Sequence, residues 1–303
     1  MCWGDKTPTP SASGASSCPP GASAPCPLDC ATKVEFKEHS PTTYGFDDHT
    51  DASGPWKSVE VGKTDKVQAE ITPAGKFANV AFTSSDTAKV TESPTTATSN
   101  SQEITLTGVT KGESEIKGAC GGAELGKMKV KAYTKNTKTV AVRLVNETGW
   151  TSTDVADADI KAALQKVYAQ AVVEFTLTRL PAKTVAFDIN GDGKIDVDSW
   201  MSAEMAKVRD ACKDDSYDFN IFLVDNPSDG STGFMQLNQR YGFIHAGNSK
   251  NPSQTIAHEM GHGQGLSHES SDSVNVMHPT AEANVGEFKK WRLRKDQWDK
   301  VNP

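Results

Sequence analysis

The sequence predicts a multidomain protein in which an all-β domain precedes an α+β domain. Short stretches of alternating polarity fill residues 31–135, helical periodicity joins them from residue 136 onward, and a histidine-rich helix lies near the C-terminus. A length of 303 residues is compatible with about two domains. We therefore expect a low-complexity segment at 1–30, a β-sandwich at 31–135 and an α+β domain at 136–303.

Charge and hydropathy exclude two broad classes of function. The net charge is −7 with a pI near 5.5, whereas nucleic acids and anionic membranes select basic surfaces. No apolar run approaches the roughly 20 residues that a membrane-spanning helix needs. We expect neither a nucleic-acid partner nor a membrane span.

The first 30 residues are rich in Pro, Ser, Ala and Gly and carry few large apolar side chains. Such a segment cannot offset the entropy of folding by itself, so we interpret it as a linker or tail. It has neither the basic region nor the apolar region of a secretory signal. Three expectations remain open: removal of a leader, export by a route that reads no leader, and cytosolic residence.

Six cysteines allow three disulfides, although spacing does not give their pairing. Alternatively, Cys120 and Cys212 are buried thiols. A zinc cluster is not favoured, because no Cys-x-x-Cys pair or nearby histidine completes a set of four ligands. The cysteines are Cys2, Cys18, Cys26, Cys30, Cys120 and Cys212.

The segment 31–135 carries the pattern of antiparallel strands. β-Branched residues alternate with polar ones, and Gly, Pro, Asp or Ser bound each stretch, which is typical of a β-sandwich. The stretches are KVEF, KVQAEI, NVAFTSS, QEITLTGV, SEIKGAC and KMKVKAY. The string ITLTGVTKGESEIKG, followed by GKMKVKAY, resembles the bacterial Ig-like modules of surface and secreted proteins. This resemblance implies an Ig-like sandwich that binds or spaces.

From residue 136 the pattern alternates between strands and helices, which predicts one α+β domain. Ser152 or Thr153 is the expected cap of the first helix. The expected strands are KTVAVRLVNE, VVEFTLTRL, TVAFD, YDFNIFLVDN and YGFIHAG. The expected helices are STDVADADIKAALQKVYAQA, SWMSAEMAKVRDACK, PSQTIAHEMGHGQG up to its glycines, and GEFKKWRLRKDQWDKV.

The stretch HEMGHGQGLSHES predicts a metal site. His258 and His262 are four residues apart, so both imidazoles lie on one face of a helix. Glu259 lies about 100° around that helix, close enough to act on a ligand of the ion without binding it. Gly265 permits a sharp turn, after which His268 supplies a third imidazole. Three neutral imidazoles leave one position open to water, as in a catalytic zinc site.

This motif, with Met277 nine residues after His268, resembles the metzincin zinc peptidases. The resemblance covers roughly residues 137–303, the segment in which the family's order of strands and helices fits. It implies a methionine turn beneath the zinc at Met277. The sequence departs from the astacin branch, which has an aromatic residue at the position of Leu266 and a tyrosine at that of Pro279.

The resemblance implies a zinc endopeptidase that acts on a protein or peptide substrate. Glu259 would serve as general base, and the substrate would lie extended along a sheet edge, either GFMQLN or YGFIHAG. His278 and Tyr241 are candidates for stabilising the oxyanion. A degenerate domain that retains zinc without activity is the alternative.

The stretch DINGDGKIDVDS resembles a calcium-binding loop. Gly193 stands at the turn position, and Ser199 replaces the usual bidentate glutamate, with Asp198 adjacent. A solvated acidic turn is the alternative interpretation. The candidate calcium ligands are Asp188, Asn190, Asp192, Lys194 through its carbonyl, and Asp196.

Three hypotheses concern biological role. The first is a secreted or secretion-system-delivered bacterial toxin with a cognate inhibitor (immunity) protein as partner, suggested by the Cys/Pro-rich segment, the Ig-like domain and the enzyme domain. The second is an adhesion or binding protein with a vestigial zinc domain. A third hypothesis has Asp29 or Cys30 silencing the zinc site as a pro-segment ligand.

Overall fold

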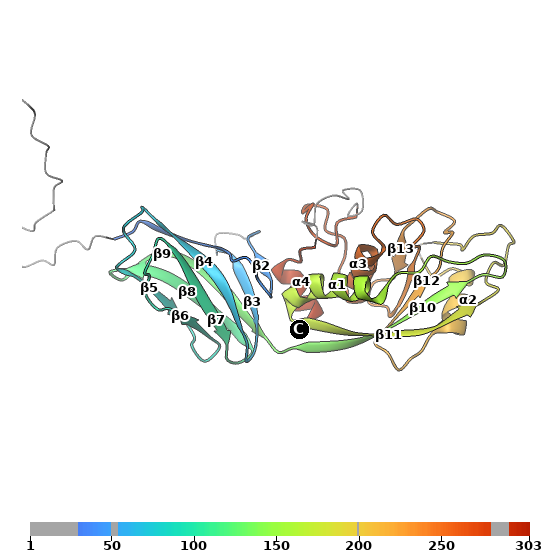
Figure 1. Cartoon of the computed structure of the whole chain (residues 1–303), viewed down its shortest axis with the longest axis horizontal. Helices are drawn as coiled ribbons and strands as arrows, with labels where there is room; N and C mark the ends of the chain where they lie inside the picture. The colour runs from blue at the N-terminus through green and yellow to red at the C-terminus, as the bar shows by residue number, and fades with distance from the viewer. Residues whose placement is uncertain (1–29, 50–53, 199, 280–290) are drawn as a thin grey trace, which may run out of the picture.

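The computed structural model describes residues 30–49, 54–198, 200–279 and 291–303 and is mostly β-sheet with few helices (Figure 1). The segment 1–29, with Cys2, Cys18, Cys26 and Asp29, lies outside the described residues. Within the described part of the chain, no helix has both the length and the apolar character needed to cross a membrane.

Two packed sheets form the predicted β-sandwich at the N-terminal side of the chain (Figure 1). The first sheet has the order β1 (Lys33–Glu38), β4 (Thr64–Thr72), β7 (Ser101–Gly108), β6 (Val90–Ser93). The second has the order β2 (Phe46–Asp47), β3 (Trp56–Glu60), β9 (Ala123–Tyr133), β8 (Gly112–Cys120), β5 (Val80–Ser84). Alternate residues of these strands, such as Val67, Ala69 and Ile71 of β4, are buried between the sheets.

The sandwich differs from the expected antiparallel pattern at β3, which pairs with β9 in parallel. β2, β3 and β6 also lie outside the predicted stretches. β3 does not alternate, because Lys57 and Ser58 are both buried. Lys57 bonds to Asp65, and Ser58 bonds to Gln170. These polar side chains are buried with partners, so the alternation of polarity that predicts a strand is absent.

A third, mixed sheet follows the sandwich, with the order β11, β10, β12, β14, β13. The first four strands are parallel, and β13 runs antiparallel to β14 at the edge. The strands are β10 (Asn136–Asn146), β11 (Val173–Thr184), β12 (Phe219–Leu223), β13 (Gly233–Met235) and β14 (Tyr241–Ile244).

Helices cover both faces of this sheet. α1 (Asp157–Tyr168) and α3 (Pro252–Gly263) share one apolar core with it, and α2 (Ala203–Cys212) packs in a separate core on the other face. α1 is amphipathic, with Ile160, Leu164 and Val167 turned toward the sheet. A short 3-10 turn, η1 (Ala169–Ala171), links α1 to β11.

The predicted caps of α1 are wrong. Ala156 precedes the helix and offers no side-chain cap. Ser152 Oγ donates instead to the carbonyl of Val145 over 2.6 Å, and the Thr153 amide donates to Asp225 Oδ2 over 2.6 Å. These bonds hold both residues against the sheet, so the helix begins later.

Two other predicted elements are shorter than expected. TVAFD leaves the sheet after Thr184, because the amides of Phe187 and Asp188 donate to the carboxylate of Glu147. In the described part of the predicted C-terminal helix, residues 291–294 are not helical and α4 spans Lys295–Val301. Gln170 binds both the carbonyl of residue 291 and the amide of residue 293, which keeps that segment extended.

A disulfide joins Cys30 to Cys120, whereas Cys212 is a buried free thiol. The interpretation of Cys120 and Cys212 as buried thiols is therefore wrong for Cys120, which is paired, and confirmed for Cys212. Because Cys30 is oxidised, the hypothesis that its thiolate binds the predicted zinc is wrong.

The sandwich and the region of the third sheet meet through α4 and the end of η1. Ser58 Oγ donates to the carbonyl of Gln170 over 2.6 Å, and the Tyr133 hydroxyl donates to Asp299 Oδ1 over 2.6 Å. Gly45 faces the fully buried Trp298, and a Cβ at Gly45 would overlap the indole.

Candidate metal centre

α3 presents two of the predicted histidines on one face. Asn251 caps the helix by accepting from the Gln254 amide over 3.2 Å, and Pro252 occupies its first turn. Its apolar side packs into the core, which turns His258 and His262 toward the cleft side with ring centroids 4.9 Å apart.

A glycine turn brings the third histidine to the same point. Gly265 has φ of +87°, and a Cβ there would lie 2.6 Å from Asn238 Oδ1. The chain thus folds back beside the helix end, and the Leu266 amide bonds to the carbonyl of Gly261. His268 Nε2 then lies 3.3 Å from His258 Nε2 and 3.2 Å from His262 Nε2.

These distances fit zinc. Tetrahedral bonds of 2.0–2.1 Å place two nitrogen ligands about 3.3 Å apart. The Nδ1 atom of His258 bonds to the carbonyl of Val276 over 2.7 Å, and that of His262 to the carbonyl of Leu266 over 2.8 Å. Because a carbonyl only accepts, each Nδ1 carries the proton and each Nε2 keeps its lone pair for a metal.

The electrostatics also favour neutral imidazoles. Burial, reinforced by the neighbouring His262, lowers the pKa of His258 to about 3. Burial likewise lowers the pKa of His262 and of His268. All three rings are therefore neutral near neutral pH, which is the form that binds a divalent cation.

Met277 lies buried beneath the helix, where a Cβ on Gly261 would overlap its sulfur. Its carbonyl accepts from the amide of Glu269 over 2.9 Å, which ties the turn to the residue after His268. The residue before Met277 supplies the carbonyl that holds His258. This turn therefore supports two of the three histidines.

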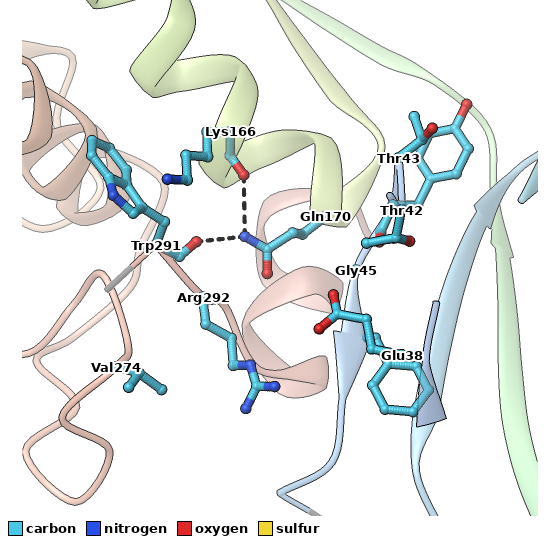
Figure 2. Close-up of a pocket in the computed structure, with 11 residues that line it drawn as sticks. Glu38, Thr42, Thr43, Gly45, Lys166, Gln170, Val274, Trp291 and Arg292 are labelled. Atoms are coloured by element: carbon cyan, nitrogen blue, oxygen red, sulfur yellow. Dashed lines mark hydrogen bonds between the residues drawn. The ribbon is translucent and has the colours of Figure 1, made fainter. Parts of the chain in front are cut away.

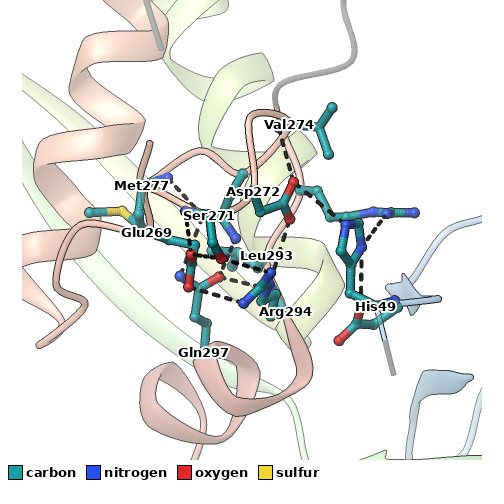
Figure 3. A network of polar contacts seen from close by, with 12 residues as sticks. His49, Glu269, Ser271, Asp272, Val274, Met277, Leu293, Arg294 and Gln297 are labelled. Carbon is teal, nitrogen blue, oxygen red and sulfur yellow. Dashed lines mark hydrogen bonds and ion pairs between the residues drawn. The ribbon is translucent and has the colours of Figure 1, made fainter. Parts of the chain in front are cut away.

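A polar network fixes the segment between the third histidine and the methionine turn (Figure 3). Arg294 forms an ion pair with Glu269 over 3.1 Å, and Ser271 donates to the same carboxylate through its hydroxyl and its amide. Asp272 faces His49 of the sandwich over 3.8 Å. The network connects the segment after His268 to α4 and to the sandwich.

Glu259 lines a pocket of about 380 Å³ together with His258, His268 and His278. Its side chain packs against Gly233, where a Cβ would lie 2.9 Å from Glu259 Oε1. The carboxylate thus stands between α3 and the edge strand β13, in the pocket that His258 and His268 also line. This position suits a base that acts on a molecule bound at the metal.

Only one of the two residues predicted to stabilise an oxyanion lines this pocket. His278 and Pro279 line the pocket of Glu259, whereas Tyr241 donates its hydroxyl to Asp215 over 2.8 Å and is not among the lining residues. Of the two segments predicted to form the sheet edge, only one does so. β13, from GFMQLN, is the edge strand, and β14, from YGFIHAG, lies inside the sheet between β12 and β13.

The predicted calcium loop forms a tight, exposed turn in which Gly191 and Gly193 have positive φ. Its side-chain oxygens accept from the loop's own amides: Asp188 from both glycines, Asn190 from Asp192, and Asp192 from Lys194. Asp188, Asp192 and Asp196 are not a group of carboxylates within 4.8 Å of one another in the described chain. Ser199 lies outside the described residues.

Within the described residues, a second group of potential ligands joins Asp47, Asp48 and His49. Arg292 Nη1 lies 2.7 Å from Asp48 Oδ1 and 3.1 Å from His49 Nδ1. The guanidinium therefore already supplies the positive charge at this position.

Figure 2 shows a further pocket, of about 460 Å³, between the sandwich and α1. Lys166 lies over the ring of Trp291 at 4.9 Å, and the Gln170 amide donates to the carbonyls of both Lys166 and Trp291. No histidine lines this pocket, and it is separate from the metal centre.

Sequence reasoning did not single out Gly233, Trp200 or Leu237. Gly233 could not be identified from the sequence, because its role depends on a contact with Glu259 that only the packing of β13 against α3 creates. Trp200 and Leu237 line a pocket beside His262 and His268, and both are exposed. The sequence did offer one indication of Trp200 and Leu237, because both are large apolar residues within otherwise polar loop segments.

No family model matches the sequence, and no curated protein matches it. Among solved structures, one of the S-layer protein SbsC is 22% identical over 27% of this chain and 12% of that chain, with a TM-score of 0.24. Domains 5–6 of SbsC are 23% identical over 31% and 47% of the two chains, with a TM-score of 0.24. The Lin-41 filamin domain is 10% identical over 34% of this chain and 95% of that chain, with a TM-score of 0.22. At these TM-scores the likenesses carry no argument about function.

Proposed function

We propose that the protein is a zinc-dependent endopeptidase of the metzincin type. The observation that carries this proposal is the convergence of three imidazole Nε2 atoms at a pocket that Glu259 and the edge strand β13 also line. His258, His262 and His268 would hold the zinc. When bound, zinc lowers the pKa of water to about 7 and polarises the scissile carbonyl.

The residues of the chain then have distinct roles. Glu259 accepts a proton from the attacking water and returns it to the leaving nitrogen. β13 pairs with the substrate main chain, and pockets on both sides of His268 let a peptide extend in both directions, as internal cleavage requires. His278 stands in the same pocket and would donate to the developing oxyanion.

We further propose that the protein acts outside the producing cell, as a secreted or injected bacterial toxin restrained by an inhibitor protein. The Cys30–Cys120 disulfide supports export, because such bonds persist in oxidising compartments. The sandwich, an Ig-like module in this proposal, would serve as a rigid mount for the peptidase.

A calcium ion would complete the loop from Asp188 to Asp196 and brace the peptidase region. Calcium prefers oxygen ligands, so binding would require the exposed side chains to leave the loop amides and turn toward one another around the ion.

The decisive experiment compares wild type with Glu259→Ala in metal analysis and in digestion of a mixed peptide library. We expect one zinc per chain in both proteins and cleavage by the wild type alone. His262→Ala is the second variant and should lose zinc as well as cleavage. Equal cleavage by Glu259→Ala would refute the mechanism, and zinc binding without any cleavage by the wild type would favour the adhesion alternative.

A further inference from the structure

Two pockets flank the third histidine along the edge strand. Glu259 lines the first, of about 380 Å³, whose opposite wall runs from Gly230 to Gly233. The second, of about 480 Å³, lies at the other end of β13, beside Phe234 and Leu237. His268 lines both pockets, so a chain laid along β13 would pass from one pocket to the other.

The two pockets differ in chemistry. The wall of the first consists of small residues with Ser231 and Thr232 between the glycines. The second exposes Trp200, at 74%, and Leu237, at 47%. Large apolar side chains at these exposures leave substantial surface in water, and contiguous apolar surface beside a reactive centre is typical of a binding site.

The chemistry of Glu259 gives the direction of the substrate. The base must return its proton to the leaving nitrogen, which belongs to the residue after the cleaved bond. That residue therefore lies on the side of Glu259, in the first pocket. The residues before the bond then lie beside His262, Leu237 and Trp200 in the second pocket, which corresponds to antiparallel pairing with β13.

We infer that Trp200 and Leu237 select substrates with a large apolar side chain on the amino-terminal side of the cleaved bond. The indole would cover one side of the bound side chain and Leu237 the other, removing apolar surface of both partners from water. The inference rests on the proposed peptidase function for the meaning of the cleaved bond.

Binding is measured in the zinc-loaded Glu259→Ala protein, so that no cleavage interferes. Two fluorescent Ala-rich peptides differ only in one central residue, Phe or Ser. We expect the Phe peptide to bind more tightly, and adding Trp200→Ala to weaken it about tenfold, as truncation of an aromatic contact does. Binding of the Ser peptide should be unchanged. Leu237→Ser should have a smaller effect of the same kind.

Val109→Ser is the matched control, because Val109 is 41% exposed on the sandwich and lines neither pocket. Equal affinity for the two peptides, or equal weakening of both by Trp200→Ala, would overturn the inference. In parallel, wild-type digestion of a peptide library should enrich Phe, Leu and Met before the cleaved bond, and enrichment after it would overturn the direction. Absence of cleavage with a retained Phe preference would refute the peptidase and leave an apolar peptide-binding groove.

Discussion

Gly233 of the edge strand and Glu259 of α3 occupy adjoining space at the mouth of the cleft. A Cβ on Gly233 would lie 2.9 Å from both Cγ and Oε1 of Glu259. Only glycine at position 233 of β13 therefore leaves room for the Glu259 carboxylate in the pocket that His258 and His268 also line.

Gly233→Ala should displace the Glu259 carboxylate and lower the rate of cleavage by about 10- to 100-fold, since small misplacements of a reacting group have effects of that size. Zinc content should not change. Thermal melting of the two single variants and the double variant Gly233→Ala/Glu259→Ala checks the cause. The destabilisation by Gly233→Ala should be smaller when Glu259 is already truncated, and a strictly additive result would contradict the contact.

Gly265→Ala should weaken zinc binding, because the added methyl group meets Asn238 and moves the chain that carries His268. Gly75→Ala is the control, since Gly75 has nearly the same positive φ but open space around it. Both variants should lose about 1–2 kcal/mol of stability from the left-handed backbone. Only Gly265→Ala should lose zinc affinity in competition with a chelator.

Reducing the Cys30–Cys120 disulfide should destabilise the sandwich. The bond closes a separation of 90 residues, and loop-closure entropy gives about 4–5 kcal/mol for loops near that length. Urea unfolding with and without reductant measures the difference in the free energy of unfolding. Cys120→Ser should respond to urea like the reduced protein, and reductant should not shift its midpoint further.

Asp299 should make the contact between α4 and the sandwich sensitive to acid. Burial alone would raise the pKa of this carboxyl, but hydrogen bonds from Lys295 and Tyr133 outweigh burial and hold the pKa below its ordinary value. A depressed pKa stabilises the fold above the unfolded-state value, near 4, and this stabilisation disappears as the pH falls further.

Melting temperatures of wild type and Asp299→Asn should accordingly differ at pH 7 and converge as the pH falls below about 4. Asp296→Asn on the exposed side of the same helix is the control and should follow the wild type throughout. A difference between wild type and Asp299→Asn that persists at the lowest pH would show that charge is not the cause.

The sequence predicted the strands whose polarity alternates, because one face of each packs in the sandwich and the other meets water. β3 was missed because Lys57 and Ser58 are buried beside partners far along the chain. The cap of α1 was wrong for a related reason, since Ser152 bonds to the sheet rather than to its own helix.

The grouping of the three histidines could be predicted because helix geometry and one glycine turn determine it locally. The supports of that group could not. Gly233, Arg294 and His49 reach the site from strand, helix and sandwich, and their distances depend on how those elements pack. Local patterns give the ligands of such a centre, and tertiary packing gives its surroundings.

The contact between Gly45 and Trp298 limits which sandwich domains could replace this one. The indole of Trp298 fills the space that a side chain at Gly45 would occupy, and the amide of Lys295 is bonded to Asp47 of the same strand region. A sandwich with a side chain at the position of Gly45 would overlap the indole, and one without a carboxylate at that of Asp47 would lose the bond to the Lys295 amide. Exchanging the sandwich for one that lacks these two residues would therefore disrupt the anchoring of α4.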